Sequence, residues 1–358
     1  MTENRPGNNT PAQPRLAVPA TLADALDPRW LEAALAVDLG GARIAGVREV
    51  EVIRTVATKV RFEVQCESGV PRAYCLKGLL DVDEMTARGG ATCVLEADFY
   101  CKVAPAVDVR VPECVAVVID RDAQQAVIVM RDLIADGARF CSALEDFSAD
   151  DAIGSLGQLA RLHAGSTLLQ GADWIRPRAA ELAAMTYVTP EMLQELMDGP
   201  RGDGLPRAVR DAGRLVAAMK SLADRDGGRP QFLIHGDSHA GNNFRDAAGR
   251  PGLIDWQLLQ RGGWALDVAY HLCAVLPVAV AEREERRLLD EYLGMMRGAG
   301  FAMPDADAAW AQYREAAIYG YYLWAITRRV DPPIINAFFH RLGSAVLRHG
   351  SHPLLGVD

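Results

Sequence analysis

Three features are missing from this 358-residue sequence, and each absence excludes a class of protein. No apolar run reaches the ~18 residues of a membrane-spanning helix, and the apolar segment 272–281 is expected to be a buried helix. The seven cysteines are an odd number without any Cys-x-x-Cys pair, so we expect the reduced core thiols of a cytoplasmic protein. An excess of basic residues is also missing. The formal net charge of −9 argues against nucleic acid as a partner.

The length of the chain allows two lobes around separate cores. Residues 1–15 are rich in Asn, Pro and Thr and begin without an apolar core, so we predict that they are disordered. No internal repeat is visible, and nothing in the sequence indicates an oligomeric state.

The most informative stretch carries Asp237, then Asn242 five residues later, and Asp255 thirteen residues after that. Phosphoryl transfer from ATP uses such a set, because one Asp orients the attacking hydroxyl while an Asn and a second Asp hold magnesium. The separation of Asp237 and Asn242 equals that between the catalytic Asp and the metal-binding Asn of a kinase catalytic loop. The short apolar segments 232–234 and 253–254 should be strands. Strands joined by a turn before Asp255 would bring it beside Asn242, as a shared Mg²⁺ requires.

The string His-Gly-Asp that ends at Asp237, followed by Asn242 and by Ile-Asp-Trp around Asp255, resembles the signature of the aminoglycoside phosphotransferase and choline kinase family. This resemblance implies an α+β, two-lobed, protein-kinase-like fold with an antiparallel-sheet N-lobe and a mainly helical C-lobe. It also implies a kinase that moves the γ-phosphoryl group of ATP to a hydroxyl of a small organic molecule. Asp237 would orient that hydroxyl and accept its proton, and Asn242 and Asp255 would hold Mg²⁺.

The predicted N-lobe spans residues 16–130 and binds ATP, and the predicted C-lobe spans residues 131–358. Lys77 ends the apolar strand 73–77, and Glu96 lies nineteen residues later in a helical stretch. The resemblance implies that Lys77 contacts the α- and β-phosphates and that Glu96 positions its ammonium group. Asp98 is not the expected partner, because it falls about 200° around the helix from Glu96.

A glycine-rich loop, which usually covers the phosphates of ATP, is missing between the first two predicted strands, 48–56 and 59–66. We expect the Thr58 hydroxyl and nearby amides to contact the phosphates instead. The strand 127–130 resembles the hinge of the family, where Met130 and Leu133 would form apolar walls for adenine. The missing glycines also keep an inactive nucleotide-binding module open as an alternative.

Two polar residues of the C-lobe are predicted to be structural. His163 ends a helix that begins after Ser148, and we expect a core histidine that braces the catalytic loop. Asp267 follows a glycine turn and should cap the helix that it opens or bond the catalytic loop. Both residues would hold the loop in shape.

Aromatic residues gather near the C-terminus, with arginines close behind. We predict that Trp264, Tyr319 and Tyr322 line an apolar acceptor pocket with Arg328 at its rim, although about half of such aromatic residues belong to a core. This stretch looks closest to the ecdysteroid-kinase-like members of the family. The predicted acceptor is therefore a largely apolar alcohol or a hydroxyacyl compound.

Two further alternatives stay open. An aminoglycoside or choline-type kinase needs carboxylates that face a cation, and four acidic residues could form such a wall: Glu181, Glu191, Glu195 and Asp198. A zinc-dependent hydrolase would use His235, Asp237 and His239, which alternate along the chain. The remaining histidines show no paired spacing of metal ligands, which disfavours the hydrolase.

Overall fold

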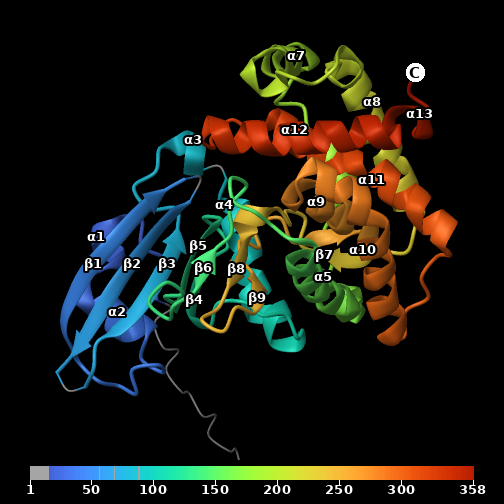
Figure 1. Ribbon diagram of the computed structural model, residues 1–358. Coiled ribbons are helices and arrows are strands. Elements are labelled where there is room, and N and C mark those ends of the chain that lie inside the picture. Colours follow the sequence, from blue (N-terminus) through green and yellow to red (C-terminus); the bar gives the residue numbers. More distant parts are fainter. Residues whose placement is uncertain (1–15, 56, 68, 88) are drawn as a thin grey trace, which may run out of the picture.

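The computed structural model describes residues 16–55, 57–67, 69–87 and 89–358. The segment predicted to be disordered, residues 1–15, lies outside the described residues. The chain forms a smaller lobe built on an antiparallel sheet and a larger lobe built mainly of helices (Figure 1). The predicted α+β fold with two lobes is confirmed.

The N-lobe is a five-stranded sheet in the order β1-β2-β3-β5-β4, with every neighbouring pair antiparallel. Its strands are β1 (Ile44–Arg54), β2 (Thr58–Cys66), β3 (Arg72–Gly78), β4 (Cys114–Asp120) and β5 (Gln125–Arg131). Side chains alternate along β5 and reach both faces of the sheet. Val127 and Val129 share a core with α2 (Pro28–Ala34), whereas Ile128 and Met130 pack with α4 (Gly90–Asp98).

The other N-lobe helices are short. They are α1 (Leu22–Ala25), α3 (Glu84–Ala87), the π-helical turn η1 (Phe99–Val103) and the 3₁₀ turn η2 (Ala104–Ala106). The π-helical turn continues α4 and brings Phe99 flat against Trp256 of the C-lobe, with ring centroids 3.8 Å apart. This stacking fixes α4, and therefore Glu96, against the segment that carries Asp255.

Helix α9 (Trp264–Val275) forms the centre of the C-lobe, and all of its residues are buried. It contacts α5 (Ala149–Ala164), α10 (Val278–Gly298), α11 (Ala306–Ile326) and α12 (Pro332–His349). In Figure 1, α12 runs across the lobe with α7 on its outer side. The remaining helical elements are η3 (Gly165–Leu169), α6 (Arg178–Ala183), α7 (Pro190–Asp198), η4 (Pro200–Gly202), η5 (Arg207–Val209), α8 (Ala212–Gly227) and α13 (Ser351–Leu354).

Two small sheets belong to the C-lobe. One has the order β6-β8-β9 and consists of β6 (Arg139–Phe140), β8 (Asn243–Arg245) and β9 (Pro251–Leu253). The other pairs β7 (Phe232–Ile234) with β10 (Gln260–Gly262). The loop with Asp237 runs from β7 through the 3₁₀ turn η6 (Ala240–Asn242) into β8. The short strands predicted on either side of the sequence motif are confirmed.

Helix α5 begins where the sequence predicts. The Ser148 Oγ accepts a hydrogen bond from the Asp151 amide at 3.1 Å, and the Asp151 carboxylate accepts one from the Ser148 amide at 3.0 Å. This reciprocal capping satisfies two amides that the first turn leaves without partners.

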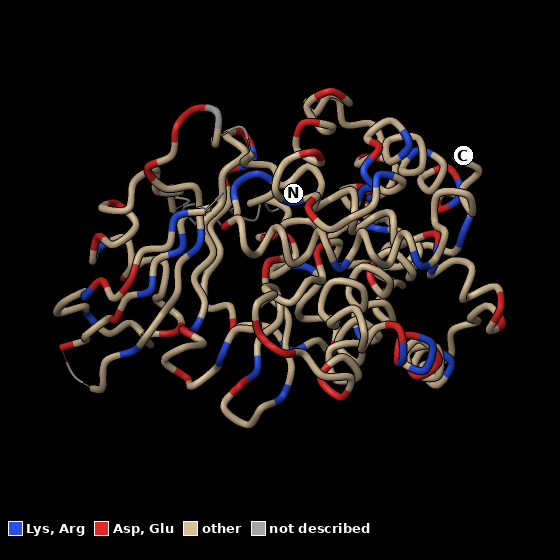
Figure 2. The backbone as a smooth tube through the Cα atoms, turned by 45° about the horizontal axis from the view of Figure 1, so that its top comes forward, with Lys and Arg blue, Asp and Glu red and all other residues tan. Residues whose placement is uncertain are grey.

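None of the helices in the described part of the chain is both long enough and apolar enough to span a membrane. Acidic and basic positions are interspersed over both lobes, as Figure 2 shows, so neither lobe carries charge of one sign alone.

Candidate active site

The loop that carries Asp237 has a backbone shape that depends on glycine. Gly236 has a φ of +77°, and a Cβ at this position would lie 2.4 Å from the Leu258 carbonyl oxygen. Any side chain here would be strained and would collide with the backbone. The His-Gly-Asp string therefore encodes a tight turn that presents Asp237 directly after β7.

Asp267 bonds the loop that carries Asp237, which was one of the two roles predicted for it. Its carboxylate is fully buried and accepts the amides of His235 at 2.7 Å and Gly236 at 2.8 Å. The ring of His163 approaches the same carboxylate at 3.1 Å and the Tyr292 hydroxyl at 2.7 Å. Burial opposes ionisation, but the hydrogen bond from His163 and the loop amide together keep the pKa of Asp267 below its ordinary value. The predicted bracing by His163 acts through Asp267.

The side chains of Asp237 and Asn242 are in contact. The Asn242 Nδ2 donates to the Asp237 backbone oxygen at 2.8 Å and to Asp237 Oδ2 at 3.2 Å. The Ile254 amide donates to the Asn242 carbonyl at 3.0 Å, so Asp255 follows directly beside Asn242. Asp255 has a φ of +65°, a left-handed conformation that is uncommon outside glycine and frequent at functional sites. The paired strands therefore bring the two predicted metal ligands together.

Lys77 joins the N-lobe to this loop. Its Nζ lies 2.5 Å from the Glu96 carboxylate and 2.8 Å from the Asp255 carboxylate. Lys77 and Glu96 are buried, so each charge needs the other. Burial opposes ionisation of Asp255, but the charges of Lys77 and Lys59 hold its pKa well below the ordinary range. The predicted Lys77–Glu96 pair is present, and Asp98 pairs instead with Arg121 at 2.6 Å.

Lys59 also lies at the site, although the sequence patterns did not indicate it. Its Nζ lies 3.6 Å from Asp255 Oδ2, and it stands opposite Lys77 in the antiparallel register of β2 and β3. Lys59 and Lys77 are equally distant from residue 68, in the turn predicted between these strands, so the hairpin itself could have revealed the match. The structure does not support the predicted phosphate contact of Thr58. Its buried hydroxyl donates to the Leu80 carbonyl at 2.9 Å and is turned away from the cleft.

A cavity of about 230 Å³ lies between the lobes beside these charges. Met130 and Leu133 line it, as predicted for the walls of an adenine site, together with Tyr100. Lys59, Lys77 and Asp255 line the same cavity and add charged groups to its lining. One cavity thus offers surfaces for an apolar ring and for phosphates.

The predicted acceptor pocket is not present as such, because its aromatic residues are core residues. Trp264 is buried and stacks on Tyr292 with ring centroids 5.6 Å apart. Tyr319 is fully buried and its hydroxyl donates to the Gly236 carbonyl, while Tyr322 is only 4 % exposed. Arg328 is exposed just after α11. The sequence allowed these aromatic residues to line a pocket or to belong to the core, and their burial shows that they belong to the core of the C-lobe.

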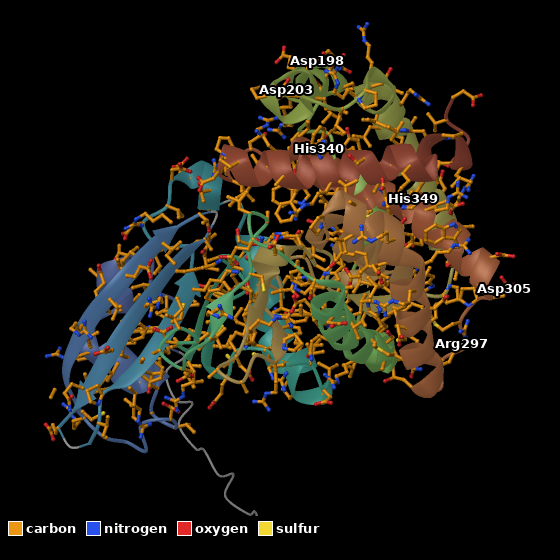
Figure 3. All side chains as sticks on the ribbon, viewed as in Figure 1. Asp198, Asp203, Arg297, Asp305, His340 and His349 are labelled. Atoms are coloured by element: carbon orange, nitrogen blue, oxygen red, sulfur yellow. The ribbon has the colours of Figure 1, made fainter. Side chains whose placement is uncertain are left out.

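Two of the four acids in the alternative wall of carboxylates are paired with arginines. Glu181 pairs with Arg176 at 3.0 Å, and Asp198 pairs with Arg210 at 3.4 Å. Figure 3 shows Asp198 on the outer side of α12, at the periphery of the C-lobe. Glu191 lies in the first turn of α7 and Glu195 is exposed on the same helix. The four acids do not form a common surface around Asp237.

The zinc alternative finds no support in the geometry of His235. Its Nδ1 accepts the Asp237 amide at 3.2 Å, and its Nε2 lies 3.0 Å from the Ile254 carbonyl, so both ring nitrogens are occupied. Within the described ranges, the three-residue group with metal-ligand spacing is Cys273, Glu285 and His349. Figure 3 places His349 near the C-terminal end of α12, away from the cleft between the lobes.

A lysine on an antiparallel sheet, paired with a glutamate on a helix and facing a loop with Asp237, Asn242 and Asp255, defines a kinase-like phosphotransferase. The pattern of the phosphotransferase enzyme family matches residues 86–315, which is well over half of the chain. The chain belongs to this family. It is therefore an ATP-dependent enzyme that phosphorylates a small molecule.

Several solved structures are similar to this chain. A protein of Ralstonia eutropha JMP134, described as a candidate aminoglycoside phosphotransferase, is similar with a TM-score of 0.50 and 13% identity over 92% of this chain and 98% of that chain. The choline kinase LicA of Streptococcus pneumoniae is similar with a TM-score of 0.47 and 13% identity, over 87% of this chain and 97% of that chain. The ethanolamine kinase of Plasmodium vivax is similar with a TM-score of 0.48 and 11% identity, over 90% of this chain and 86% of that chain. The comparison with curated proteins gave no match.

Proposed function

We propose that the chain moves the γ-phosphoryl group of ATP to a hydroxyl of a small organic molecule, with Asp237 as the residue that orients this hydroxyl and accepts its proton. Lys77, positioned by Glu96, would neutralise charge on the α- and β-phosphates. The observation that carries this proposal is the contact of Lys77 with both Glu96 and Asp255, which places the cation beside the catalytic loop.

The donor set next to Asp237 fits magnesium. Asn242 uses its amide nitrogen to bond Asp237, which leaves its side-chain oxygen as the atom for a metal. The lowered pKa of Asp255, caused by Lys77 and Lys59 against the effect of burial, keeps this carboxylate anionic at neutral pH. One carboxylate and one carboxamide suit Mg²⁺, which keeps water and phosphate oxygens as its other ligands. When bound here, Mg²⁺ would supply charge that offsets the charge of the phosphates.

The nucleotide would place its adenine between Met130 and Leu133 and its phosphates towards Lys77. The lining of the cavity supports this placement, because it includes both the apolar side chains of Met130 and Leu133 and the cations of Lys59 and Lys77. Lys59 takes the role that we expected for Thr58, since it lies on the strand just after the first turn and points at Asp255.

We further propose that the acceptor is an uncharged or anionic alcohol, which includes the hydroxyacyl compounds predicted from the sequence. A polycation needs unpaired carboxylates, but Glu181 and Asp198 are already paired with Arg176 and Arg210. The aromatic residues do not indicate a largely apolar scaffold, because their rings are buried.

An ATP-consumption screen tests both proposals. Purified full-length protein is supplied with Mg²⁺-ATP and, in turn, sterols, hydroxyacyl thioesters, choline-like alcohols, sugars and aminoglycosides, and ADP is measured. We expect turnover with an uncharged or anionic alcohol, lost in Asp237→Asn, which keeps the side-chain shape but removes the proton acceptor. Asp246→Asn, in the exposed turn after β8, is the matched control and should retain turnover.

Two results would overturn the proposals separately. Turnover of aminoglycosides alone would reject the acceptor class and leave the assignment of Asp237 intact. An Asp237→Asn variant that retains turnover within a few-fold of the parent would reject Asp237 as the proton acceptor.

A further inference from the structure

The carboxylate of Asp237 has a second hydrogen-bond donor besides Asn242, and this donor comes from the helical core. The hydroxyl of Tyr270, on α9, donates to Asp237 Oδ1 at 3.0 Å. Tyr270 is fully buried, so Oδ1 faces the interior of the C-lobe. Asn242 Nδ2 is 3.2 Å from the other oxygen, Oδ2. The Asp237 side chain keeps 17% of its surface exposed, which leaves Oδ2 as the oxygen for the cleft.

The hydrogen of the Tyr270 hydroxyl has only one direction available. The indole Nε1 of Trp324, on α11, lies 2.7 Å from the Tyr270 oxygen. An indole N–H can only donate, so the tyrosine oxygen must accept from Trp324 and its own hydrogen must go to Asp237. Trp324 is itself buried, with 4 % of its surface exposed. The chain Trp324, Tyr270, Asp237 is therefore a relay of hydrogen bonds with a fixed direction, running from the core to the catalytic carboxylate.

The backbone of α11 is shaped to hold the Tyr270 ring. A Cβ at Gly320 would lie 2.3 Å from Tyr270 Cδ2, far inside van der Waals contact. Only glycine lets the two helices approach closely enough for the Tyr270 ring to contact the backbone of α11. Tyr319 flanks the same ring edge to face, with centroids 5.8 Å apart. The position of the Tyr270 hydroxyl is thus fixed by packing as well as by its hydrogen bonds.

We propose that Tyr270 and Trp324 are positioning residues for phosphoryl transfer, which hold the Asp237 carboxylate so that Oδ2 is presented to the acceptor hydroxyl. This inference rests on the proposed role of Asp237. In the transfer, the O–H bond of the acceptor breaks and its proton moves to Oδ2. The hydroxyl oxygen bonds the γ-phosphorus as the bond from this phosphorus to the β,γ-bridging oxygen breaks, and ADP leaves. Asp237 then returns the proton to water through its exposed side.

A misplaced carboxylate affects the chemical step more than substrate binding, because proton transfer depends on close geometry. Tyr270→Phe removes the hydroxyl and keeps the ring. We expect kcat to fall about tenfold to a hundredfold, the range for one hydrogen bond to a charged group, while KM for ATP stays within twofold. Trp324→Phe should lower kcat by less, since the Tyr270 hydroxyl can still reach Asp237 but is free to turn.

The matched control is Tyr321→Phe, because Tyr321 is a buried tyrosine of α11 whose hydroxyl donates to the Val209 carbonyl at 2.9 Å. This variant loses the same group at the same depth, away from Asp237, and should keep kcat within twofold. The melting temperature of each variant, with and without ADP, separates loss of fold from loss of chemistry.

The double variant Tyr270→Phe/Trp324→Phe tests the relay itself. If Trp324 acts through Tyr270, adding Trp324→Phe should leave kcat within about twofold of Tyr270→Phe alone. Turnover is measured with the best acceptor of the screen and, in parallel, as hydrolysis of ATP by water. Multiplied losses in the double variant would show that Trp324 acts independently.

Asp237→Ala is measured beside these variants to separate two kinds of failure. If Asp237→Ala retains turnover, the proposed function of Asp237 is wrong. If Asp237→Ala loses turnover while Tyr270→Phe keeps kcat within twofold, the function stands and the positioning role is wrong. Equal losses of kcat and of ADP binding in Tyr270→Phe would also reject the role, since they would indicate a general structural defect.

Discussion

Asp267→Asn is the sharpest test of how the catalytic loop is held. The carboxylate accepts three donors, the amides of His235 and Gly236 and the ring of His163, and has no exposed surface. In the wild-type protein, the His235 amide and the His163 ring bond Oδ2, and the Gly236 amide bonds Oδ1. The asparagine has a single side-chain oxygen. If this oxygen takes the place of Oδ2, the NH₂ group faces the Gly236 amide. One charge-assisted bond is lost and a buried donor is left without an acceptor.

The expected loss follows from these contacts. A hydrogen bond to a charged group contributes about 1.5–3 kcal/mol, and a buried unsatisfied group costs about 1–3 kcal/mol. The variant also removes the desolvation cost of a buried charge, which offsets part of this loss. We therefore expect the free energy of unfolding to fall by about 2–4 kcal/mol. The pKa of Asp267 is lowered in the folded state, so its stabilisation is present at neutral pH and is lost as the pH falls through the folded value. The variant should lack this part of the acid sensitivity.

Urea unfolding followed by tryptophan fluorescence measures this change, and kcat is measured on the same preparations. Asp226→Asn is the control, because Asp226 is a similarly buried carboxylate (4 % exposed) that accepts a single loop amide, from Gly263 at 2.9 Å. We expect a smaller loss of stability there and little change in kcat. An Asp267→Asn protein that unfolds within about 0.5 kcal/mol of the parent and keeps its kcat would refute the bracing role, since ordinary surface substitutions have effects of that size.

Three further predictions concern charge at the site. Asp255→Ala should abolish the magnesium-dependent part of the ATP thermal shift, and a full shift in that variant would move the metal elsewhere. Lys59→Ala should raise KM for ATP at least several-fold with little loss of stability, because its side chain is 27% exposed; unchanged KM in a kinetic titration would show that Lys59 does not contact the nucleotide. Burial lowers the pKa of His271 to about 4, and its two ring nitrogens already bond Ser155 and the Ser238 carbonyl. The unfolded chain therefore binds a proton at His271 more readily than the folded chain. The contribution of His271 to the free energy of unfolding should be constant above about pH 7 and should fall as the pH is lowered from about 6.5 to 4. His271→Gln should flatten that slope in urea titrations, and an unchanged slope would assign it to other groups.

The sequence predicts that Asp237, Asn242 and Asp255 lie close together, because their proximity depends on short-range order. Asp237, Asn242 and Asp255 lie on one loop and the two strands beside it, so spacing alone brings them together. Lys77 and Glu96 are harder, since they come from a strand and a helix, but a buried lysine requires a buried acid close by. The register of the hairpin could also have given Lys59, which faces Lys77 across it.

The acceptor side could not be predicted in the same way, because an aromatic residue at helical spacing suits a core and a pocket equally well. Tyr319 and Trp264 could be assigned only after α9, α10 and α11 were placed around them, and contacts between helices depend on long-range packing. The same reason explains why Tyr270 and Trp324 were not recognised as partners of Asp237. Their side chains are 54 residues apart in sequence and meet only because Gly320 lets α11 approach α9. Two of these aromatic residues contact the loop with Asp237 or its support: Tyr319 donates to the Gly236 carbonyl, and Trp324 donates to Tyr270, which donates to Asp237. The spacing of the motif thus brings Asp237, Asn242 and Asp255 together, whereas the packing of the C-lobe helices fixes the side chains that contact Asp237 from the core.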